Sequence, residues 1–406
     1  MSNSRATAPD SLRAWIVSCA AFLACSIAHG FLYTFGVFLK PMGSGLAASH
    51  AVMAILFSFM SVLFYLLTPV AGELADHIGA RKVMLAGALL FAVGLVGTAR
   101  AGSYLVALPS LGIGVGGTLA CVYVPAIAAV GEWFKKYRDL ALGIALSGIG
   151  VGTLVAAPLN AWLIRAYGWR STLMILGISG GLLLLVSAVL MFRPPVKVEG
   201  TKGGRAVWAK VRTPQFWLVY LSRMFTAIPV FIAMIYLPAL AEKEDVGSVS
   251  AAALVGYIGG ASIVSRLGLN ALAEKLGATL LFQFSCVCIG AACVLWIFAY
   301  SYLTLVFFVV VLGIAYGGVA SLTPAVAIEI FGLENIGELL GLLLTSFGVA
   351  AAIGPPAAGV LVDRSHNYRD IVWLALAASV LGLISGLALS KFRPVPKPES
   401  TEQAVA

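Results

Sequence analysis

Twelve long apolar runs, separated by short polar turns, constrain the fold of this chain more than any other feature. About 20 apolar residues make an α-helix long enough to cross the hydrocarbon core of a bilayer. The runs lie at 14–39, 51–73, 83–99, 103–130, 140–164, 171–192, 215–241, 246–272, 278–300, 302–328, 339–362 and 370–390. The sequence therefore predicts an all-α membrane protein with twelve transmembrane helices.

The composition excludes the water-soluble classes. Of 406 residues, 61% are hydrophobic and 11% are charged, whereas a soluble globular chain is typically about 45–50% apolar and about 25% charged. The six cysteines all lie inside apolar runs, where a thiol packs as a small hydrophobic side chain. The spans contain no metal-ligand cluster, no Ser/His/Asp arrangement and no Walker sequence. We therefore expect no enzyme, no cofactor, no metal and no ATP-driven pump.

The longest polar break divides the chain into two halves. Residues 193–213 contain two prolines, three glycines and six Lys or Arg. The sequence thus predicts an N-terminal six-helix bundle at 1–192, a cytoplasmic central loop at 193–213 and a C-terminal six-helix bundle at 214–390. A cytoplasmic tail follows at 391–406.

The basic residues predict the orientation. The chain has 26 Lys and Arg against 17 Asp and Glu, for a net charge of +9. With both termini on one side of the membrane, seventeen Lys and Arg fall on that side and seven on the other. Because cytoplasmic loops carry the basic excess, we expect a multi-pass protein of the cell inner (plasma) membrane with both termini cytoplasmic. Its basic tracts face the lipid bilayer, so we expect no nucleic-acid partner, and no obligate protein partner is evident.

The two halves of the sequence repeat one another in order. The segment GELADHIGA at 72–80 corresponds to NALAEKLGA at 270–278. Further pairs are LGIGVGG at 111–117 with LGIAYGG at 312–318, Pro125 with Pro324, and Gly143, Gly150 and Pro158 with Gly341, Gly348 and Pro356. Parallel duplicated bundles place a substrate path between the halves, which rock against each other to give alternating access. The repeat therefore predicts two pseudo-symmetric six-helix bundles and a transport function.

One loop carries a more specific signature. Gly72-x-Leu-Ala-Asp76-x-x-Gly-x-Arg81 resembles the loop motif of the major facilitator superfamily. The resemblance implies a conformational latch formed by Gly72, Asp76 and Arg81, in which the charged side chains pair or cap helix ends. The second copy has Asn270 and Thr279 where Gly72 and Arg81 stand, so we expect a weaker latch there.

Three further segments resemble one branch of that superfamily. YTFGVFLKP at 33–41, WFKKYRDLALGIALSGIGVG at 133–152 and Arg266 together are similar to the monocarboxylate porter family, of which this chain looks like a bacterial member. The resemblance implies transport of small monocarboxylates of the lactate and pyruvate class, usually as symport with a proton. Two departures stand out, since Ser262 occupies the position of the family's aspartate and Tyr33 that of a lysine found in many members.

Two arginines lie inside spans, whereas none of the seventeen carboxylates lies deep in one. A membrane-embedded arginine needs a partner or a water-filled cavity, and a guanidinium can bind a carboxylate through two parallel hydrogen bonds. We therefore expect Arg266 to bind an anionic substrate, against the alternative that it extends to the cytoplasmic interface. Arg223 is the second cationic candidate, with helix packing or interfacial extension as its alternatives.

Four further residues are candidates for the same site. Tyr123 and Tyr316 lie on the glycine-rich spans, and their hydroxyls, with that of Tyr33, could complete the hydrogen bonds of a carboxylate or serve in aromatic packing. His29 is the only histidine deep in a span. A histidine titrates near neutral pH, which makes His29 the proton-coupling candidate, with a packing role as the alternative.

Other functions remain open on the same scaffold. If both arginines faced the cavity, a dicarboxylate or other organic-anion exchanger or uniporter would be favoured. A non-transporting membrane sensor would bind a ligand without flux, but no signalling domain supports it. The sequence leaves open which acid is carried, whether a proton accompanies it and in which direction it moves.

Overall fold

The computed structural model describes residues 9–192, 204–332 and 336–391. These residues form helices and short connections, with no strand among them. Most of the expected central loop (193–213) and tail (391–406) lies outside the described residues.

The helices follow one another along the whole described chain. They are α1 (Leu12–Tyr33), η2 (Phe35–Phe38), α2 (Leu39–Gly45), α3 (His50–Ile78), α4 (Ala80–Ala99), α5 (Tyr104–Leu111), η3 (Gly112–Gly116), α6 (Gly117–Trp133), α7 (Arg138–Val189), α8 (Gly204–Val211), α9 (Pro214–Lys243), α10 (Ser248–Leu276), α11 (Ala278–Ile297), α12 (Tyr302–Phe331), α13 (Ile336–Ser365), α14 (Asp370–Ala388) and η4 (Leu389–Lys391).

Eleven helical stretches in the described chain are long and apolar enough to cross a membrane. One of them, α7, has 52 residues, which at 1.5 Å per residue would extend about 78 Å, far beyond the ~30 Å hydrocarbon core. Gly168 interrupts α7 with φ 75° and ψ 162°, so α7 contains two spans. The described residues therefore hold twelve transmembrane segments in the predicted order. Gly168 lies within the expected turn at 165–170, and the helices on its two sides extend into the rest of that turn.

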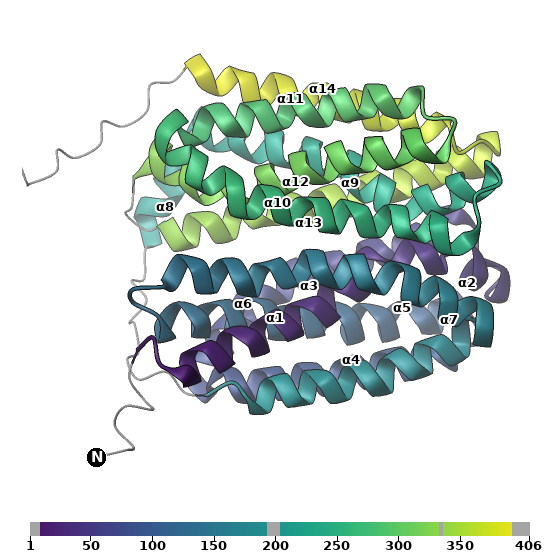
Figure 1. Ribbon diagram of the computed structural model, residues 1–406, viewed down its shortest axis with the longest axis horizontal. Helices are drawn as coiled ribbons and strands as arrows, with labels where there is room; N and C mark the ends of the chain where they lie inside the picture. The colour runs from purple at the N-terminus through teal and green to yellow at the C-terminus, as the bar shows by residue number, and fades with distance from the viewer. Residues whose placement is uncertain (1–8, 193–203, 333–335, 392–406) are drawn as a thin grey trace, which may run out of the picture.

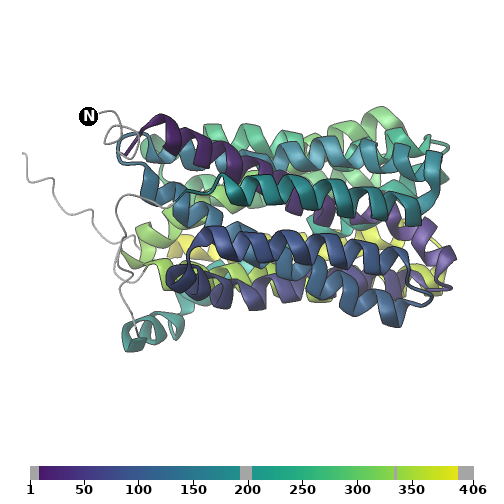
Figure 2. The same cartoon turned by 90° about the horizontal axis from the view of Figure 1, so that it is seen from below.

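The spans run side by side in two groups. Figure 1 shows α1 to α7 in one group and α9 to α14 in the other, and Figure 2 shows the same lengthwise alignment from below. The N-terminus and α8 lie at one end of the molecule and α2 at the other. We call these the terminal end and the far end.

The same turn recurs at corresponding places in the two groups. Gly79, with φ 92° and ψ 143°, separates α3 from α4, and Gly277, with φ 89° and ψ 137°, separates α10 from α11. A positive φ of this kind is readily adopted only by glycine. The repeated sequence segments therefore build repeated backbone geometry.

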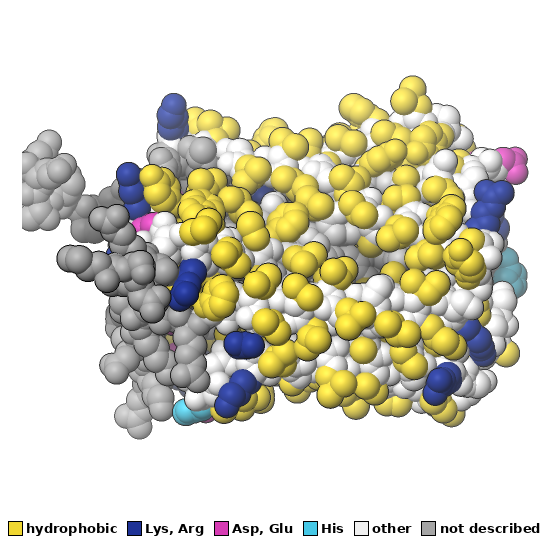
Figure 3. All heavy atoms as spheres, turned by 60° about the horizontal axis from the view of Figure 1, so that its bottom comes forward, with side chains coloured by type: hydrophobic (Ala, Val, Ile, Leu, Met, Phe, Trp, Pro, Cys, Tyr) yellow, Lys and Arg dark blue, Asp and Glu magenta, His cyan; other side chains and the backbone are white. Residues whose placement is uncertain are grey.

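The outer surface fits a bilayer. Figure 3 shows hydrophobic side chains covering the middle of the molecule, while Lys and Arg gather towards its two ends. Large apolar side chains are exposed on several spans, including Leu89 (66%), Leu182 (58%), Phe284 (60%) and Leu303 (77%). So large an exposed apolar surface is unstable in water but matches lipid tails.

A short segment before α1 is hydrogen-bonded to the loop that precedes α7. The carboxylate of Asp10 accepts hydrogen bonds from the backbone N–H groups of Lys135, Lys136 and Tyr137, at 3.2–3.3 Å. Burial acts to raise the pKa of Asp10, but these backbone hydrogen bonds outweigh it and hold the pKa below its ordinary value. Trp15 stacks edge-on against Phe134, with ring centroids 4.9 Å apart, which ties α1 to the same loop.

Candidate functional site

The two groups of spans meet tightly at the far end, where α13 reaches α3. The carboxylate of Asp363 accepts hydrogen bonds from the backbone N–H groups of His50 (3.0 Å) and Ala51 (2.9 Å). A negative charge is favourable at a helix N-terminus, so a side chain of the second group caps the first turn of α3 in the first group.

The imidazole of His50 completes this contact. Its Nδ1 lies 2.9 Å from Asp363 Oδ1, and its Nε2 lies 2.7 Å from the hydroxyl of Tyr368. Because a carboxylate only accepts, Nδ1 carries a proton. Burial and the charges of Glu242 and Asp363 raise the pKa of Tyr368 to about 12, so the tyrosine keeps its proton and can donate it to Nε2.

A second contact crosses between the groups nearby. Lys40 Nζ lies 2.8 Å from Glu242 Oε2 and donates to the Ala239 carbonyl oxygen at 3.2 Å. The backbone of η2 approaches α9 so closely that a Cβ on Gly36 would overlap the carbonyl oxygen of Met234. Together with Asp363 and His50, these residues close the far end of the space between the groups.

Aromatic side chains gather deeper between the groups. The hydroxyls of Tyr33 on α1 and Tyr316 on α12 lie 3.3 Å apart, which joins two of the predicted site residues across the two groups. The ring of His29 packs against Tyr33, Tyr123 and Phe64, with centroid distances of 5.8, 5.3 and 5.7 Å. His29, Tyr33 and Tyr316 are 2–6% exposed. We call Tyr33, Tyr123, Tyr316 and His29 the aromatic cluster.

The hydrogen bonding of His29 fixes its tautomer. Nδ1 lies 3.3 Å from the carbonyl oxygen of Cys25, and since a carbonyl only accepts, Nδ1 carries the proton in the neutral ring. Nε2 is then the nitrogen on which a further proton would bind.

Arg266 lines a cavity beside this cluster. The cavity is narrow, and its walls include Tyr33, Tyr316, Thr153 and Ser262. Arg266 is partly exposed and interacts electrostatically with Tyr33, Tyr123 and His29. The arginine and the four residues of the aromatic cluster are therefore neighbours between the two groups of spans.

Ser262 lies in the same cavity. Its hydroxyl donates to the carbonyl oxygen of Gly259 at 2.7 Å, and the side chain is 2% exposed. Ser262, which stands where the resemblance implies an aspartate, thus lines the same cavity as Arg266. Its hydroxyl is neutral and already donates its proton to a carbonyl oxygen of α10.

Arg223 is buried beside Phe347, whose ring centroid lies 6.0 Å from that of Tyr316. It is 2% exposed, so it does not extend to an interface. Its Nε donates to Ser346 Oγ at 3.2 Å, and its guanidinium carbon lies 4.3 Å from the ring centroid of Phe347. It also interacts electrostatically with Tyr123 and Tyr316. Its contacts include packing and hydrogen bonding as well as proximity to the aromatic cluster.

The loop motif lies apart from the cavity. Gly72 and Asp76 belong to the last turns of α3, and Arg81 begins α4 just beyond Gly79. Asp76 and Arg81 are exposed. These residues flank the repeated turn at the terminal end and do not join the aromatic cluster. Among the described residues, no three His, Cys, Asp or Glu side chains are grouped so that they could hold a metal ion.

Sequence reasoning missed the far-end contacts. Lys40, His50, Glu242, Asp363 and Tyr368 all stand at span ends, where charged residues also occur for reasons of topology. The only signal in the sequence was the opposite charge of residues in different far-end loops, and many such pairings were available.

Comparisons with known proteins agree with this geometry. The family model of the Major Facilitator Superfamily matches residues 21–301 and 271–406. Monocarboxylate transporter 3 of Rattus norvegicus is 32% identical over 389 residues, covering 92% of this chain and 79% of its own. Monocarboxylate transporter 4 of Gallus gallus is 27% identical over 419 residues, covering 98% of this chain and 88% of its own.

A solved structure shares the fold. The crystal structure of a bacterial homologue of the human lysosomal transporter Spinster, in an inward-facing and occupied conformation, aligns with a TM-score of 0.75 and 16% sequence identity, covering 92% of this chain and 96% of that one. Twelve spans in two groups around a central cavity define a membrane transporter of the major facilitator fold. The chain belongs to the Major Facilitator Superfamily and, within it, to the monocarboxylate transporter family. It is therefore a transport protein and not an enzyme.

Proposed function

We propose that this protein is a secondary active transporter of small monocarboxylates of the lactate and pyruvate class. One observation carries the proposal, namely that Arg266 lines a cavity between the two groups of spans together with Tyr33 and Tyr316. The names of the relatives support the substrate class. An anion in this cavity would offset a membrane-embedded positive charge that is otherwise costly.

The residues suggest how the anion is held. The guanidinium of Arg266 would bind the carboxylate through two hydrogen bonds, and the hydroxyls of Tyr33 and Tyr316 would reach it by giving up their mutual contact of 3.3 Å. The substrate would then contact α10 and α12 of one half and α1 of the other. Its binding and release would thereby be coupled to the movement of one half against the other.

We further propose that His29 carries the co-transported proton. The groups packed around it are Tyr33 and Cys25 on α1, Phe64 on α3, Tyr123 on α6 and, through its charge, Arg266 on α10. Two positive charges placed close together, on Arg266 and on a protonated His29, repel each other. A bound carboxylate offsets that repulsion, so substrate and proton would bind together.

A second candidate function is exchange of dicarboxylates or other organic anions. It rests on Arg223, a second buried cation within electrostatic range of Tyr123 and Tyr316. A substrate with two carboxylates could bind Arg266 with one and approach Arg223 with the other. Transport of succinate in preference to lactate would favour this candidate.

The proposed topology places both termini in the cytoplasm of the cell that holds this protein in its inner (plasma) membrane. The N-terminal bundle (1–192), central loop (193–213), C-terminal bundle (214–390) and tail (391–406) are the proposed units. In this orientation the far-end contacts of Asp363 and Lys40 close the extracytoplasmic side, and Gly72, Asp76 and Arg81 form the latch on the cytoplasmic side.

Transport in proteoliposomes tests the proposal. We expect the unaltered protein to take up labelled lactate or pyruvate, and Arg266→Gln to lower initial uptake by about a hundredfold, since hydrogen bonds to charged groups contribute roughly 1.5–3 kcal/mol. The control is Arg100→Gln, which removes an exposed arginine at the far end. Unchanged uptake by Arg266→Gln would refute the site, and substrate binding without flux by the unaltered protein would indicate a sensor instead.

A further inference from the structure

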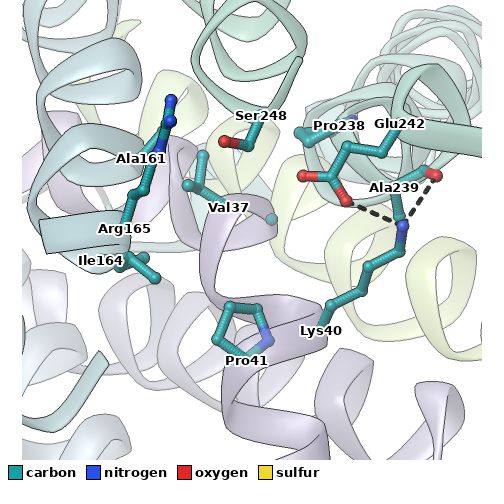
Figure 4. A pocket seen from close by; sticks show the side chains of 11 residues that line it. Val37, Lys40, Pro41, Ala161, Ile164, Arg165, Pro238, Ala239, Glu242 and Ser248 are labelled. Atoms are coloured by element: carbon teal, nitrogen blue, oxygen red, sulfur yellow. Dashed lines mark hydrogen bonds and ion pairs between the residues drawn. The ribbon is translucent and has the colours of Figure 1, made fainter. Parts of the chain in front are cut away.

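A second cavity lies at the far end, away from Arg266. Its volume is about 270 Å³, and none of its lining residues also lines the cavity around Arg266. Figure 4 shows its walls coming from both halves, with Val37 and Lys40 from η2 and α2, Arg165 from α7, and Glu242 and Ser248 from α9 and α10. We call it the outer cavity.

The charges of the outer cavity do not balance. Lys40 is paired with Glu242 at 2.8 Å, and Figure 4 shows Arg165 on the other side of Val37 from this pair. Among the described residues, Arg165 has no hydrogen-bond or ion-pair partner. Ser248, the first residue of α10, adds the positive end of a helix dipole. The lining thus carries two cations, one carboxylate and a helix N-terminus.

We propose that the outer cavity is a second binding site for a small carboxylate anion, held by Arg165 and by a Lys40 that leaves Glu242 to bind it. The proposal rests on the proposed function, because it adds a peripheral site for the same class of substrate. It assigns a binding role to Arg165, Lys40 and Glu242, which lie outside the aromatic cluster.

The exposure of the ion pair makes this exchange of partners feasible. The side chains of Lys40 and Glu242 are 38% and 31% exposed, and solvent screening leaves such a pair weakly bound. An anion bound in the outer cavity would accept hydrogen bonds from the guanidinium of Arg165 and from the ammonium group of Lys40. The vacated Glu242 is accessible to water and can be solvated.

The remaining lining suits a short organic acid. Val37, Pro41, Ile164 and Pro238 give the cavity an apolar part beside its charges. A volume of 270 Å³ falls just below the roughly 300–1,000 Å³ of pockets for drug-sized ligands. A carboxylate with a few carbon atoms fits this combination.

Binding in the outer cavity also acts on the closure of the far end. Lys40 belongs to the first half and Glu242 to the second, so their pair joins the halves. An anion that takes Lys40 from Glu242 removes that link. A ligand that favours the state without the pair shifts the population towards it, so carboxylate outside would favour opening of the far end.

Protection of a cysteine tests the site without measuring transport. Ser248→Cys places a thiol in the outer cavity, and Ser301→Cys places one on an exposed far-end residue outside it. Both are labelled from the far side with a membrane-impermeant maleimide in proteoliposomes. We expect lactate to protect Cys at 248 but not at 301, and the neutral isostere lactamide to protect neither.

Variants then distinguish lactate binding in the outer cavity from lactate binding in the cavity around Arg266. In an Arg266→Gln background, lactate should still protect the thiol at 248, whereas Arg165→Gln should raise the half-protecting concentration about tenfold. Arg100→Gln is the matched control and should leave it unchanged. Glu242→Gln should lower the half-protecting concentration, because Lys40 then has no competing carboxylate.

Each outcome decides one of the two proposals. Protection that vanishes in Arg266→Gln, or that Arg165→Gln leaves unaltered, overturns the outer site even if the unaltered protein transports lactate. Protection that persists in a protein that transports no monocarboxylate supports the outer site and overturns the proposed function. Should Arg266→Gln fail to fold, Arg266→Lys supplies the same background with the charge retained and the forked geometry lost.

Discussion

The two halves of this transporter have the same backbone arrangement but place different polar side chains beside the cavity between them. Gly79 and Gly277 adopt nearly the same φ and ψ at corresponding turns. In contrast, both arginines that lie inside spans, Arg223 and Arg266, belong to the second half, whereas His29 belongs to the first. The repeated backbone therefore accounts for the cavity between the halves, whereas the different side chains of the two halves would account for the proposed preference for anions.

The same divergence appears at the repeated turn. The first copy has the exposed pair Asp76 and Arg81 on either side of Gly79. In the second copy, Thr279 replaces the arginine and binds Glu329 Oε2 through its backbone N–H (2.9 Å) and its hydroxyl (2.8 Å). That contact joins α11 to α12 inside one half. The second copy therefore stabilises its own half.

After that of Arg266→Gln, the largest effect that tests this difference between the halves is expected from Arg223. Arg223→Met keeps much of the side-chain volume and removes the charge. Because the charge lies within electrostatic range of Tyr123 and Tyr316, we expect initial uptake of lactate to fall by about tenfold to fiftyfold, mainly through a raised KM. Thermal unfolding in detergent should show unchanged or increased stability, since replacing a buried charge by an apolar group removes its desolvation penalty.

The matched control is an arginine that also stacks on an aromatic ring but lies far from the cavity. The guanidinium carbon of Arg170 is 4.1 Å from the ring centroid of Trp169, and its Nη2 donates to the Ala101 carbonyl oxygen at 3.0 Å. Arg170→Met should lower the unfolding temperature and leave KM unchanged. If Arg223→Met behaved in the same way, the role of Arg223 would be packing alone.

The sequence predicted the spans well because their signal is physical and local. A run of about 20 apolar residues spans the bilayer as a helix almost regardless of its neighbours, and the twelve runs recur as helices in order. The break between the fifth and sixth spans was also predicted, since Gly168 lies between the expected runs at 140–164 and 171–192. In the structure the residues around Gly168 continue the helix on both sides of this positive-φ glycine.

The candidate site was predictable only in part. The scarcity of intramembrane charge singled out Arg223 and Arg266, and both do lie between spans near the aromatic cluster. No local pattern could have paired Tyr33 with Tyr316, which are 283 residues apart, or Asp363 with the first turn of α3. Such contacts depend on how the two halves meet, which hydrophobic periodicity does not encode.

An intermediate effect is expected from His29, which contributes the titratable group of the first half. With one proton per substrate, a gradient of one pH unit supports about tenfold accumulation of lactate. His29→Gln should abolish this accumulation, because an amide does not take up a proton, while exchange of labelled for unlabelled lactate at equal pH should continue. The readout is steady-state uptake with and without the gradient.

His29→Phe serves as the packing control for that substitution. It retains the ring contacts with Tyr123 and Phe64 but also lacks a titratable nitrogen, so it should match His29→Gln in accumulation. Accumulation by either variant equal to that of the unaltered protein would remove His29 from proton coupling.

The smallest effect is expected from removing the hydrogen bond between Tyr33 and Tyr316, one of the contacts between the two halves. Tyr33→Phe and Tyr316→Phe each remove one hydroxyl of the pair at 3.3 Å, and we expect each to raise the KM for lactate about threefold, since a neutral hydrogen bond contributes roughly 0.5–1.5 kcal/mol. If the hydroxyls serve only each other, the double variant should be no worse than either single one. If both also bind the carboxylate, as proposed, the effects should multiply to about ninefold. A double-mutant cycle on KM distinguishes these outcomes, and multiplication would mean that the substrate replaces the contact between the halves when it binds.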